Sequence, residues 1–271
     1  MVAATARLRA AGVPDPARDA RLLLAHAAQV DATRITLIAP EDIAPEIEER
    51  YDRLVSLRAV RVPVSQLIGE REFYGRPFKI SRDVLDPRPE TETLIEAALS
   101  EPFERLLDLG TGSGCILVTL LAERTGATGL GVDLSEAACL QAGANAVMHG
   151  VQDRAEIDLS NWFQTVEGRF DLIVSNPPYL ALTEYETASP ELREHEPRMA
   201  LTDEGDGLGA YRVIAQEAPA FLEAGGRVLV EIGWQQGRAV AAMFEALGWS
   251  RVNVLKDMGG HDRVIAAQNP A

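Results

Sequence analysis

Apolar residues recur at helical spacing in two stretches near the start of the chain. In residues 17–30 and 45–60 they fall three or four positions apart, which predicts two helices with one apolar face each. Asp15 and Pro16 form a good start for the first helix, and Pro63 ends the second. The positions on these two faces are Ala20, Leu23, Leu24 and Ala27, then Ile47, Tyr51, Leu54 and Leu57. We therefore predict a small helical domain over residues 1–68 that docks the substrate or a partner.

The pattern changes at Gly69, where short apolar segments replace the helical periodicity. Residues 73–75 and 78–80 flank Arg76-Pro77, which predicts a short hairpin and a linker over residues 69–86. A further helix opens in residues 87–92. Its two carboxylates, Glu90 and Glu92, point apart and suit the positive end of the helix dipole.

Strand-like and helical segments alternate from Arg105 onward. This alternation predicts a parallel, doubly wound sheet, so we assign residues 87–271 to an α/β domain. The strand-like runs are residues 105–109, 129–134, 155–159, 170–175, 226–232, 250–255 and 263–267. The helical patterns between them include residues 115–124, 135–149, 210–221 and 237–247.

The composition is that of a folded protein and excludes several classes. Of the 271 residues, 46% are hydrophobic and 25% are charged, which excludes a wholly disordered chain. No apolar run approaches the roughly 20 residues of a membrane helix, and no signal peptide follows Arg7 and Arg9. Cys115 and Cys139 lie far apart, which excludes a disulfide framework and a thiolate zinc site. We therefore expect a soluble, cytoplasmic protein that does not associate with membranes.

The charge is unevenly distributed along the chain. With 41 acidic and 26 basic side chains, the formal net charge is −15. Residues 1–80 hold 12 basic and 11 acidic side chains, whereas the remainder holds 14 against 30, a net of −16. Surfaces that neutralise phosphates are usually basic, so we predict no direct nucleic-acid binding. The four histidines lack the spacing of metal ligands, so no metal is predicted.

A glycine-rich loop follows the first predicted strand of the sheet. Residues 108–114 read Asp-Leu-Gly-Thr-Gly-Ser-Gly, and the glycines allow a tight turn and close approach of a ligand. Asp133 ends the next strand, where a carboxylate can accept both hydroxyls of a ribose. Strand, loop and carboxylate together predict a site for a nucleoside-bearing cofactor. The GxGxG spacing differs from the GxGxxG of nicotinamide dehydrogenases and disfavours that class.

The fourth predicted strand ends in Asn176-Pro177-Pro178-Tyr179. Ligands of open α/β sheets lie beyond the carboxyl ends of the strands, so this turn should border the glycine loop. Two prolines supply no N–H, which leaves the Asn176 side chain and the Pro177 carbonyl as acceptors. Such a pair suits a planar NH2 group, and Tyr179 provides a flat wall. One hydrogen of that NH2 group would go to Oδ1 of Asn176 and the other to the Pro177 carbonyl.

These motifs resemble known methyltransferases. Asp-x-Gly-x-Gly-x-Gly in residues 108–114 with Asn-Pro-Pro-Tyr in residues 176–179 resembles the class I S-adenosylmethionine methyltransferases that act on amide or exocyclic nitrogens. Residues 69–75 and 87–92, Gly-Glu-Arg-Glu-Phe-Tyr-Gly and Pro-Arg-Pro-Glu-Thr-Glu, narrow the likeness. Over nearly its whole length the chain resembles the HemK/PrmC family, the peptide chain release factor N(5)-glutamine methyltransferases. Two positions depart from the family pattern, Asn161 before Trp162 and Asp86 before Pro87.

The resemblance implies a fold, a cofactor and a set of site residues. The fold is Rossmann-like, with a mostly parallel seven-stranded sheet and a small N-terminal helical domain joined by a β-hairpin. The cofactor is S-adenosylmethionine, released as S-adenosylhomocysteine, and its implied site consists of Gly110, Thr111, Gly112, Ser113, Gly114, Asp133, Trp162 and Asn176. The glutamine of a release factor's Gly-Gly-Gln tripeptide is implied to lie against Asn176, Pro177, Pro178 and Tyr179, with Asn176, Pro177 and Tyr179 catalytic.

Other functions remain open at this point. The same Asn-Pro-Pro-Tyr turn suits an adenine methyltransferase on DNA or RNA, although the acidic charge argues against it. A ribosomal-protein glutamine methyltransferase is disfavoured by the Arg-Pro-Glu-Thr-Glu segment, and a non-catalytic module would not need a paired amide acceptor. The acidic residues 184–206 form either one side of the substrate cleft or a solvated insertion.

Overall fold

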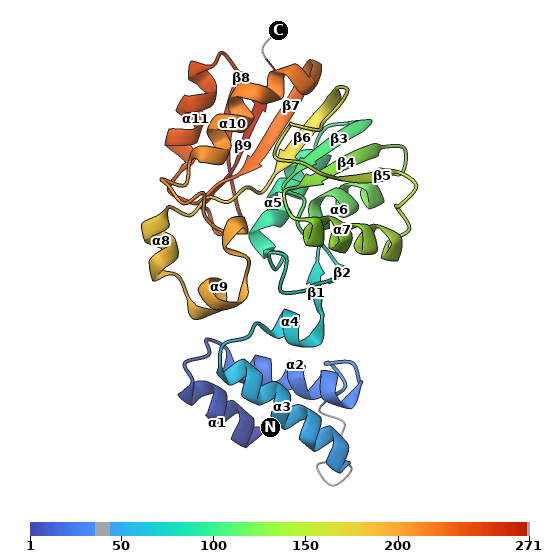
Figure 1. The fold of residues 1–271 in the computed structure, drawn as a ribbon, viewed down its shortest axis with the longest axis vertical. Helices are drawn as coiled ribbons and strands as arrows, with labels where there is room; N and C mark the ends of the chain where they lie inside the picture. The colour runs from blue at the N-terminus through green and yellow to red at the C-terminus, as the bar shows by residue number, and fades with distance from the viewer. Residues whose placement is uncertain (36–43, 270–271) are drawn as a thin grey trace. The chain divides into compact units, whose positions relative to one another are not determined.

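The computed structural model describes residues 1–35 and 44–269 and divides the chain into two compact units (Figure 1). Unit 1 consists of residues 1–70 together with residues 189–195, and unit 2 consists of residues 71–188 and 196–271. A short segment from the middle of the chain thus packs with the N-terminal helices. No local pattern in the sequence indicates this membership.

Unit 1 is helical, and its predicted helices are confirmed. Its elements are α1 (Val2–Ala10), α2 (Pro16–Ala28), α3 (Pro45–Ala59), α4 (Val64–Ile68) and, from the later segment, α9 (Pro190–His195). The Asp15 side chain accepts a hydrogen bond from the backbone N–H of Arg18 and so caps α2. The prediction for Leu57 is wrong, because this side chain is 47% exposed. The inward face of α3 instead passes through Tyr51 and Val55 to Arg58.

Arg58 is a buried cation at the centre of unit 1. Its Nε donates to Oδ2 of Asp19 at 2.7 Å, and its Nη2 donates to Oε1 of Glu191 at 3.0 Å. Arg61 also donates from Nε to Oε1 of Glu191, at 2.6 Å. Hydrogen bonds between charged groups are the stronger kind, so one carboxylate of α9 joins this segment to the end of α3.

The predicted hairpin is present as β1 (Glu70–Phe73) and β2 (Arg76–Lys79). Its turn lies at Tyr74 and Gly75, which both have positive φ, 50° and 68°. Arg76 and Pro77 belong to β2, because a two-residue turn with positive φ matches the twist of the two strands. Phe73 is 2% exposed and packs in the core of unit 2. Glu92 stands in the first turn of α5, at the positive end of the helix dipole as predicted, and its Oε1 also accepts a hydrogen bond from the Tyr74 N–H, which holds the hairpin turn.

Unit 2 contains the predicted seven-stranded, mostly parallel sheet. Its strands are β3 (Arg105–Leu109), β4 (Thr128–Asp133), β5 (Ala155–Leu159), β6 (Phe170–Ser175), β7 (Leu222–Glu231), β8 (Ser250–Lys256) and β9 (Asp262–Gln268). The spatial order is β5-β4-β3-β6-β7-β9-β8, and β9 runs antiparallel to both of its neighbours. The reversal between β4 and β6 around β3 is the topological switch point at which ligands bind in such sheets.

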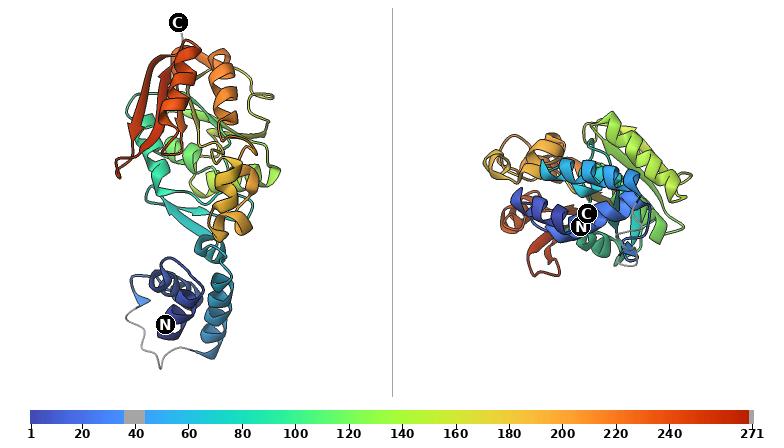
Figure 2. Two further views of the ribbon diagram at one scale, coloured as in Figure 1. Left: turned by 90° about the vertical axis from the view of Figure 1, so that its left-hand side faces the viewer. Right: turned by 90° about the horizontal axis from the view of Figure 1, so that it is seen from below.

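Helices cover both faces of this sheet (Figures 1 and 2). On one side lie α5 (Glu92–Leu99), α6 (Cys115–Glu123) and α7 (Glu136–Met148), and on the other lie α10 (Gly209–Glu217) and α11 (Gly237–Ala246). Successive residues of a strand point to opposite faces, so Leu106 joins the first core and Leu107 the second. Both side chains are fully buried, which fixes the register of β3.

Four parallel strands end at the same edge of the sheet. Leu109 of β3 pairs with Val132 of β4 on one side and with Ser175 of β6 on the other, and Ser175 pairs with Val230 of β7. The next residues along β4, β6 and β7 therefore lie close together beyond this edge. The connection from β6 to α10 contains α8 (Leu182–Thr187), α9 and the short 3-10 helix η4 (Arg198–Ala200).

Candidate active site

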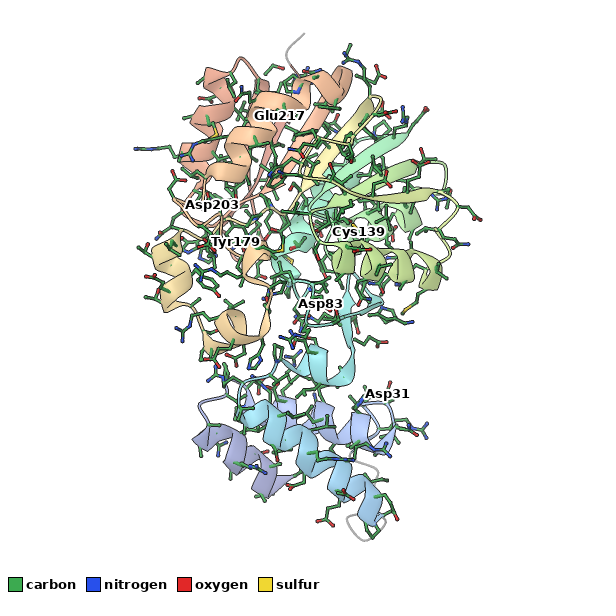
Figure 3. The ribbon with its side chains drawn as sticks, in the orientation of Figure 1. Asp31, Asp83, Cys139, Tyr179, Asp203 and Glu217 are labelled. Atoms are coloured by element: carbon green, nitrogen blue, oxygen red, sulfur yellow. The ribbon has the colours of Figure 1, made fainter. Side chains whose placement is uncertain are left out.

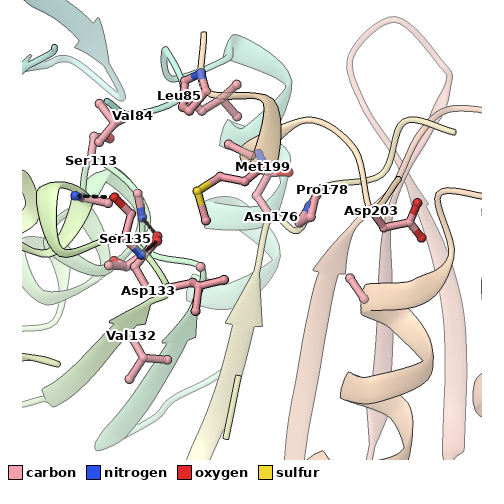
Figure 4. A pocket seen from close by; sticks show the side chains of 18 of the residues that line it. Val84, Leu85, Ser113, Val132, Asp133, Ser135, Asn176, Pro178, Met199 and Asp203 are labelled. Atoms are coloured by element: carbon pink, nitrogen blue, oxygen red, sulfur yellow. Dashed lines mark hydrogen bonds between the residues drawn. The ribbon is translucent and has the colours of Figure 1, made fainter. Parts of the chain in front are cut away.

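A cavity of about 740 Å³ lies at the carboxyl ends of these strands within unit 2 (Figure 4). Its walls come from the glycine loop, the end of β4, residues 160–162, the turn after β6, the segment before α5, and parts of residues 197–213. Figure 4 shows Asp133 and Ser135 at the β4 end and Asn176 and Pro178 at the β6 end, with Met199 between them in this view. The strand ends thus bring together residues from distant parts of the sequence.

The glycine loop forms one wall of the cavity through its backbone. Gly110 and Gly112 have φ of 71° and 56°, a conformation that side chains disfavour. The N–H groups of Gly110 and Thr111 both donate to the Val132 carbonyl, which ties the loop to β4. Thr111, Ser113 and these two glycines line the cavity as predicted, whereas Gly114 does not.

Gly114 serves the packing of two helices. It begins α6 with φ of 77°, and a Cβ there would lie 3.0 Å from the Cβ of Ala142 on α7. Such a contact is tighter than most that a Cβ makes, and the positive φ also disfavours a side chain at this position. Gly114 therefore sets the position of the loop by letting α6 and α7 approach.

Asp108 accepts hydrogen bonds from the glycine loop and from α6, a role that the sequence interpretation missed. Its Oδ2 accepts a hydrogen bond from the Thr111 hydroxyl at 2.8 Å and from the Leu117 N–H at 3.2 Å. The side chain is fully buried, and this burial raises its pKa to about 7 against those two hydrogen bonds. A carboxylate inside an otherwise apolar strand is the signal that would have identified it, because acidic residues are rarely fully buried.

Asp133 stands between the loop and the following helix. Its Oδ2 accepts from the Gly112 N–H and its Oδ1 from the Ser135 N–H, both at 2.9 Å. Burial raises the pKa of this carboxyl, while these backbone hydrogen bonds lower it. Each oxygen keeps a lone pair for a hydroxyl of a ligand, since a carboxylate accepts about four hydrogen bonds.

Trp162 lines the cavity in an unusual backbone conformation. Its φ is 54°, which is rare for a bulky residue and indicates a constrained position. The Ser160 hydroxyl donates to its carbonyl at 2.9 Å and supports this turn. Asn161, one of the departures from the family pattern, is exposed and also lines the cavity. The other departure, Asp86, is buried with its Oδ1 at 3.9 Å from Nε of Arg71.

Asn176 presents an unused hydrogen-bond acceptor beside the cavity. Its Nδ2 donates to the Thr91 hydroxyl at 3.3 Å, whereas its buried Oδ1 receives no hydrogen bond from the described residues. A buried acceptor without a partner costs about 1–3 kcal/mol, so a bound N–H would stabilise it. Asn176 and Pro178 line the cavity, but Pro177 and Tyr179 are not among its lining residues.

The chain after Tyr179 is held by Gln236 of unit 2 (Figure 3 labels Tyr179). Nε2 of Gln236 donates to the carbonyls of Tyr179 and Gly207, at 2.8 and 3.2 Å. A Cβ at Gly207 would lie 2.4 Å from the Tyr179 carbonyl oxygen, so only glycine fits there. Burial raises the pKa of the Tyr179 hydroxyl to about 12, which keeps this group neutral.

The acidic segment after the turn takes part in the cavity wall. Residues 197–200 and 202–204 line the cavity, which confirms the prediction that this stretch borders the cleft. It is not one long loop, because it contains α8, α9 and η4. Sequence reasoning did not single out Thr91 as a wall residue, since its contribution depends on how distant segments meet.

Two further properties follow from the described residues. Over residues 1–35 and 44–269, no group of three or more His, Cys, Asp or Glu side chains is arranged to hold a metal ion. No helix in that part of the chain is long and apolar enough to span a bilayer.

The donor set of the cavity fits an S-adenosyl group. The Asp133 carboxylate suits ribose hydroxyls, the Trp162 indole suits an adenine, and the glycine loop admits close approach of the remainder. Asn176, whose buried Oδ1 has no hydrogen-bond partner among the described residues, lines the same cavity.

Comparison with known proteins identifies the family of this chain. A family model described as the PrmC N-terminal domain matches residues 1–69, and one for the methyltransferase small domain matches residues 72–206.

Release factor glutamine methyltransferases from Cereibacter sphaeroides and Agrobacterium fabrum are 56% and 42% identical to this chain. They match over 99% and 98% of it, and over 97% and 94% of their own lengths. A methyltransferase structure from Pyrococcus furiosus, 17% identical with a TM-score of 0.57, covers 83% of this chain and 100% of its own and shows the same fold. The chain belongs to the release factor glutamine methyltransferase family, whose members depend on S-adenosylmethionine, as the sequence motifs predict.

Proposed function

We propose that this protein transfers a methyl group from S-adenosylmethionine to the side-chain amide nitrogen of the glutamine in the Gly-Gly-Gln motif of peptide chain release factors, and thereby modulates translation termination. The observation that carries the proposal is the unpartnered Oδ1 of Asn176 beside a cavity built by a glycine loop. Two relatives named release factor glutamine methyltransferase, similar along nearly the whole chain, support it.

The proposed donor site comprises Gly110, Thr111, Gly112, Ser113, Asp133, Trp162 and Asn176. The bound donor supplies a methyl group on a sulfonium, which is already activated for transfer. Asp133 would orient the ribose, and Trp162 would cover the adenine. Gly114 acts on this site through the position of α6, so its proposed role is indirect.

The proposed acceptor site addresses the weakness of an amide nitrogen as a nucleophile. Its lone pair is delocalised into the carbonyl, so the protein must align it and stabilise positive charge as it develops. Oδ1 of Asn176 and the Pro177 carbonyl would accept the two N–H groups, with Pro178 and Tyr179 as walls. Alignment contributes up to about 7–11 kcal/mol in favourable cases, and acceptors of this kind strengthen as charge grows on nitrogen.

The remaining parts of the chain have proposed roles as well. The helical residues 1–68 would dock the release factor, residues 69–86 would link them to the catalytic part, and residues 87–271 would hold both substrates. The net charge of −16 beyond residue 80 argues against direct contact with DNA or RNA, and so against adenine methylation. Because release factors act in the cytoplasm, we place the protein there.

The first test is tritium transfer from S-adenosylmethionine to purified release factor. A Gln→Ala variant of the Gly-Gly-Gln tripeptide, DNA, total RNA and ribosomal protein are assayed in parallel. We expect label on the wild-type factor alone. Label on nucleic acid or on ribosomal protein alone would overturn the proposal, and equal labelling of the Gln→Ala variant would move the acceptor to another residue.

A further inference from the structure

Glu231 carries a buried carboxyl, as Asp108 does. It lies beside Asn176 and has no part in the mechanism described above. Ser175 pairs with Val230, so Asn176 and Glu231 are the next residues on two neighbouring parallel strands. Glu231 is fully buried, and neither of its carboxyl oxygens has a hydrogen bond of ordinary geometry within the described residues. It is not among the residues that line the cavity. Burying an unpaired carboxyl is costly, so its presence requires an explanation.

Thr91 connects this carboxyl to the amide of Asn176. The Thr91 hydroxyl oxygen lies 3.3 Å from Nδ2 of Asn176, and the same side chain lies near enough to Glu231 to favour the charged form of its carboxyl. Thr91 is 1% exposed, so it has little access to water as an alternative partner. A hydroxyl has only one proton, and it donates to one of these neighbours at a time.

We propose that Glu231 is a positioning residue that determines, through the Thr91 hydroxyl, which end of the Asn176 amide is offered to the substrate nitrogen. The proposal rests on the role of Asn176 proposed above. A charged Glu231 only accepts hydrogen bonds, so Thr91 must donate to it. The Thr91 oxygen then accepts from Nδ2 of Asn176, and Oδ1 is left for the substrate N–H. This is the arrangement observed between Asn176 and Thr91.

A protonated Glu231 permits the opposite arrangement. Its O–H can donate to Thr91, and the Thr91 hydroxyl is then free to donate to the Asn176 side chain. The Asn176 amide would then turn its NH2 group toward the NH2 group of the substrate, so that two hydrogen-bond donors would face each other. The active orientation therefore requires ionised Glu231, and turnover should rise with pH as this carboxyl loses its proton.

The groups around Glu231 bring its pKa close to neutral pH. Burial raises the pKa of Glu231 to about 7, and the nearby Thr91 side chain and the charge of Arg263 oppose the rise. The charged and titratable groups that act on Glu231, or on which it acts, are Arg263 of β9, Arg88 and Glu90 before α5, Tyr179 after β6, Tyr211 of α10 and Cys115 of α6. Arg263 and Arg88 lower the pKa of Glu231, and Glu90 raises it. The charges of these neighbours therefore favour the ionised carboxyl, whereas burial favours the protonated one.

The test compares Glu231→Gln with Glu223→Gln, an exposed carboxyl on the same strand. The kcat for methylation of the release factor is measured from pH 6 to pH 9 with both substrates saturating. We expect the wild type and Glu223→Gln to gain activity with a midpoint near the pKa of Glu231. Glu231→Gln should lose that rise and about tenfold in kcat at pH 8, the effect of one hydrogen bond. Asp108, which burial also brings to a pKa of about 7, is unchanged in both variants, so the difference belongs to Glu231.

Binding of S-adenosylmethionine, measured by calorimetry, should stay within about twofold in Glu231→Gln, because an orientation effect on the acceptor does not weaken the donor site. Thr91→Ser should keep the pH profile, and Thr91→Val should lose it. A wild-type profile in Glu231→Gln, or equal losses in kcat and donor binding, would overturn the proposal.

A measurement that does not depend on turnover distinguishes a failure of this proposal from a failure of the proposed function. In protein labelled with ¹⁵N-asparagine, the side-chain NH2 signal of Asn176 is assigned by its loss in Asn176→Ala. That signal should titrate near pH 7 in the wild type and not in Glu231→Gln. If the wild type methylates no release factor but the signal titrates as expected, only the assigned substrate fails. If the signal does not titrate, the positioning role fails whatever the substrate. Should Glu231→Gln not fold, the Thr91→Ser and Thr91→Val pair decides by the same signal.

Discussion

The guanidinium of Arg88 donates from Nη2 to both carboxyl oxygens of Glu196, at 2.6 Å each. The Glu196 side chain is 2% exposed, and the Arg88 side chain is 30% exposed. Burial raises the pKa of Glu196, and the charge of Arg88 lowers it more than the charge of Arg71 does, so the carboxylate depends mainly on Arg88. The pair fixes the beginning of residues 196–206 against the segment before α5, where both form the cavity wall.

Removing the cation should therefore destabilise unit 2. Arg88→Met leaves a buried carboxylate without its partner and should lower the free energy of unfolding by about 2 kcal/mol. This is less than the 3–5 kcal/mol of fully buried pairs, because Arg88 is partly solvated. Urea unfolding at pH 8 measures the effect, and the double variant Arg88→Met/Glu196→Gln should recover part of it. Equal stabilities of the single and double variants would show that the pair is not coupled.

Asn176→Ala removes the proposed acceptor for the substrate nitrogen. We expect kcat to fall about 100- to 1,000-fold, the usual cost of one preorganised hydrogen-bonding group in a transition state. Binding of S-adenosylmethionine should weaken only modestly, because most of the proposed donor contacts lie on the glycine loop and β4. Single-turnover kinetics and calorimetry measure the two quantities. Asn253→Ala, an exposed asparagine on β8, serves as the control. Similar losses in turnover and donor affinity would refute the assignment.

Asp133→Asn tests the proposed ribose site. The carboxylate accepts from the N–H groups of Gly112 and Ser135 with different oxygens, and an asparagine can accept with only one. The NH2 group would then face a backbone donor and move the loop. We expect the Kd of S-adenosylmethionine to rise about tenfold or more, from the loss of a charged hydrogen bond, with a smaller change in kcat. Asp158→Asn, an exposed carboxyl on β5, should bind the donor as the wild type does. An unchanged Kd in Asp133→Asn would remove Asp133 from the donor site.

The regular parts of the fold are predictable from the sequence because they depend on local periodicity. The runs predicted at residues 105–109 and 115–124 become β3 and α6 within one residue. The hairpin turn is shifted because Tyr74 adopts a φ of 50°, which its side chain gives no reason to expect. The place of α9 in unit 1 depends on Glu191 meeting two arginines some 130 positions earlier, and no local pattern encodes that.

The same distinction holds for the candidate site. Asp133 and Asn176 could be predicted because each stands at the end of a strand, where parallel strands must meet at one edge. Asp108 and Glu231 lie within buried strands, and the packing around them decides their chemistry. Their only local sign is a carboxyl that interrupts an apolar run. That sign does not say which residues surround the carboxyl, so the proximity of Thr91 to Glu231 could be found only in the structure.

Glu191→Ala should loosen α9 within unit 1. It removes the carboxylate that Arg58 and Arg61 share, while Arg58 keeps Asp19. Local opening should then expose the peptide bond after Arg193, and limited trypsin digestion should cut there about tenfold faster. Mass spectrometry identifies the cleavage. Glu194→Ala on the same helix, where the side chain is exposed, should be cut at the wild-type rate. Equal rates for the Glu191 variant and the wild type would mean that this cluster does not hold α9.

Glu231 should also make the stability of the protein depend on pH. Burial raises its pKa from the ordinary 4.5 to about 7, so the folded state holds the proton more tightly than the unfolded chain. The contribution to stability is complete below about pH 4.5 and is lost as the pH rises past about 7. At 1.36 kcal/mol per pKa unit it amounts to roughly 3 kcal/mol.

Glu231→Gln has no such proton to lose, so its free energy of unfolding relative to the wild type should increase by about that amount between pH 4.5 and pH 8. Urea unfolding at several pH values measures the difference, and Glu223→Gln should follow the wild type. Parallel curves for Glu231→Gln and the wild type would show that Glu231 is ionised throughout, which would also remove the basis for its control of Asn176.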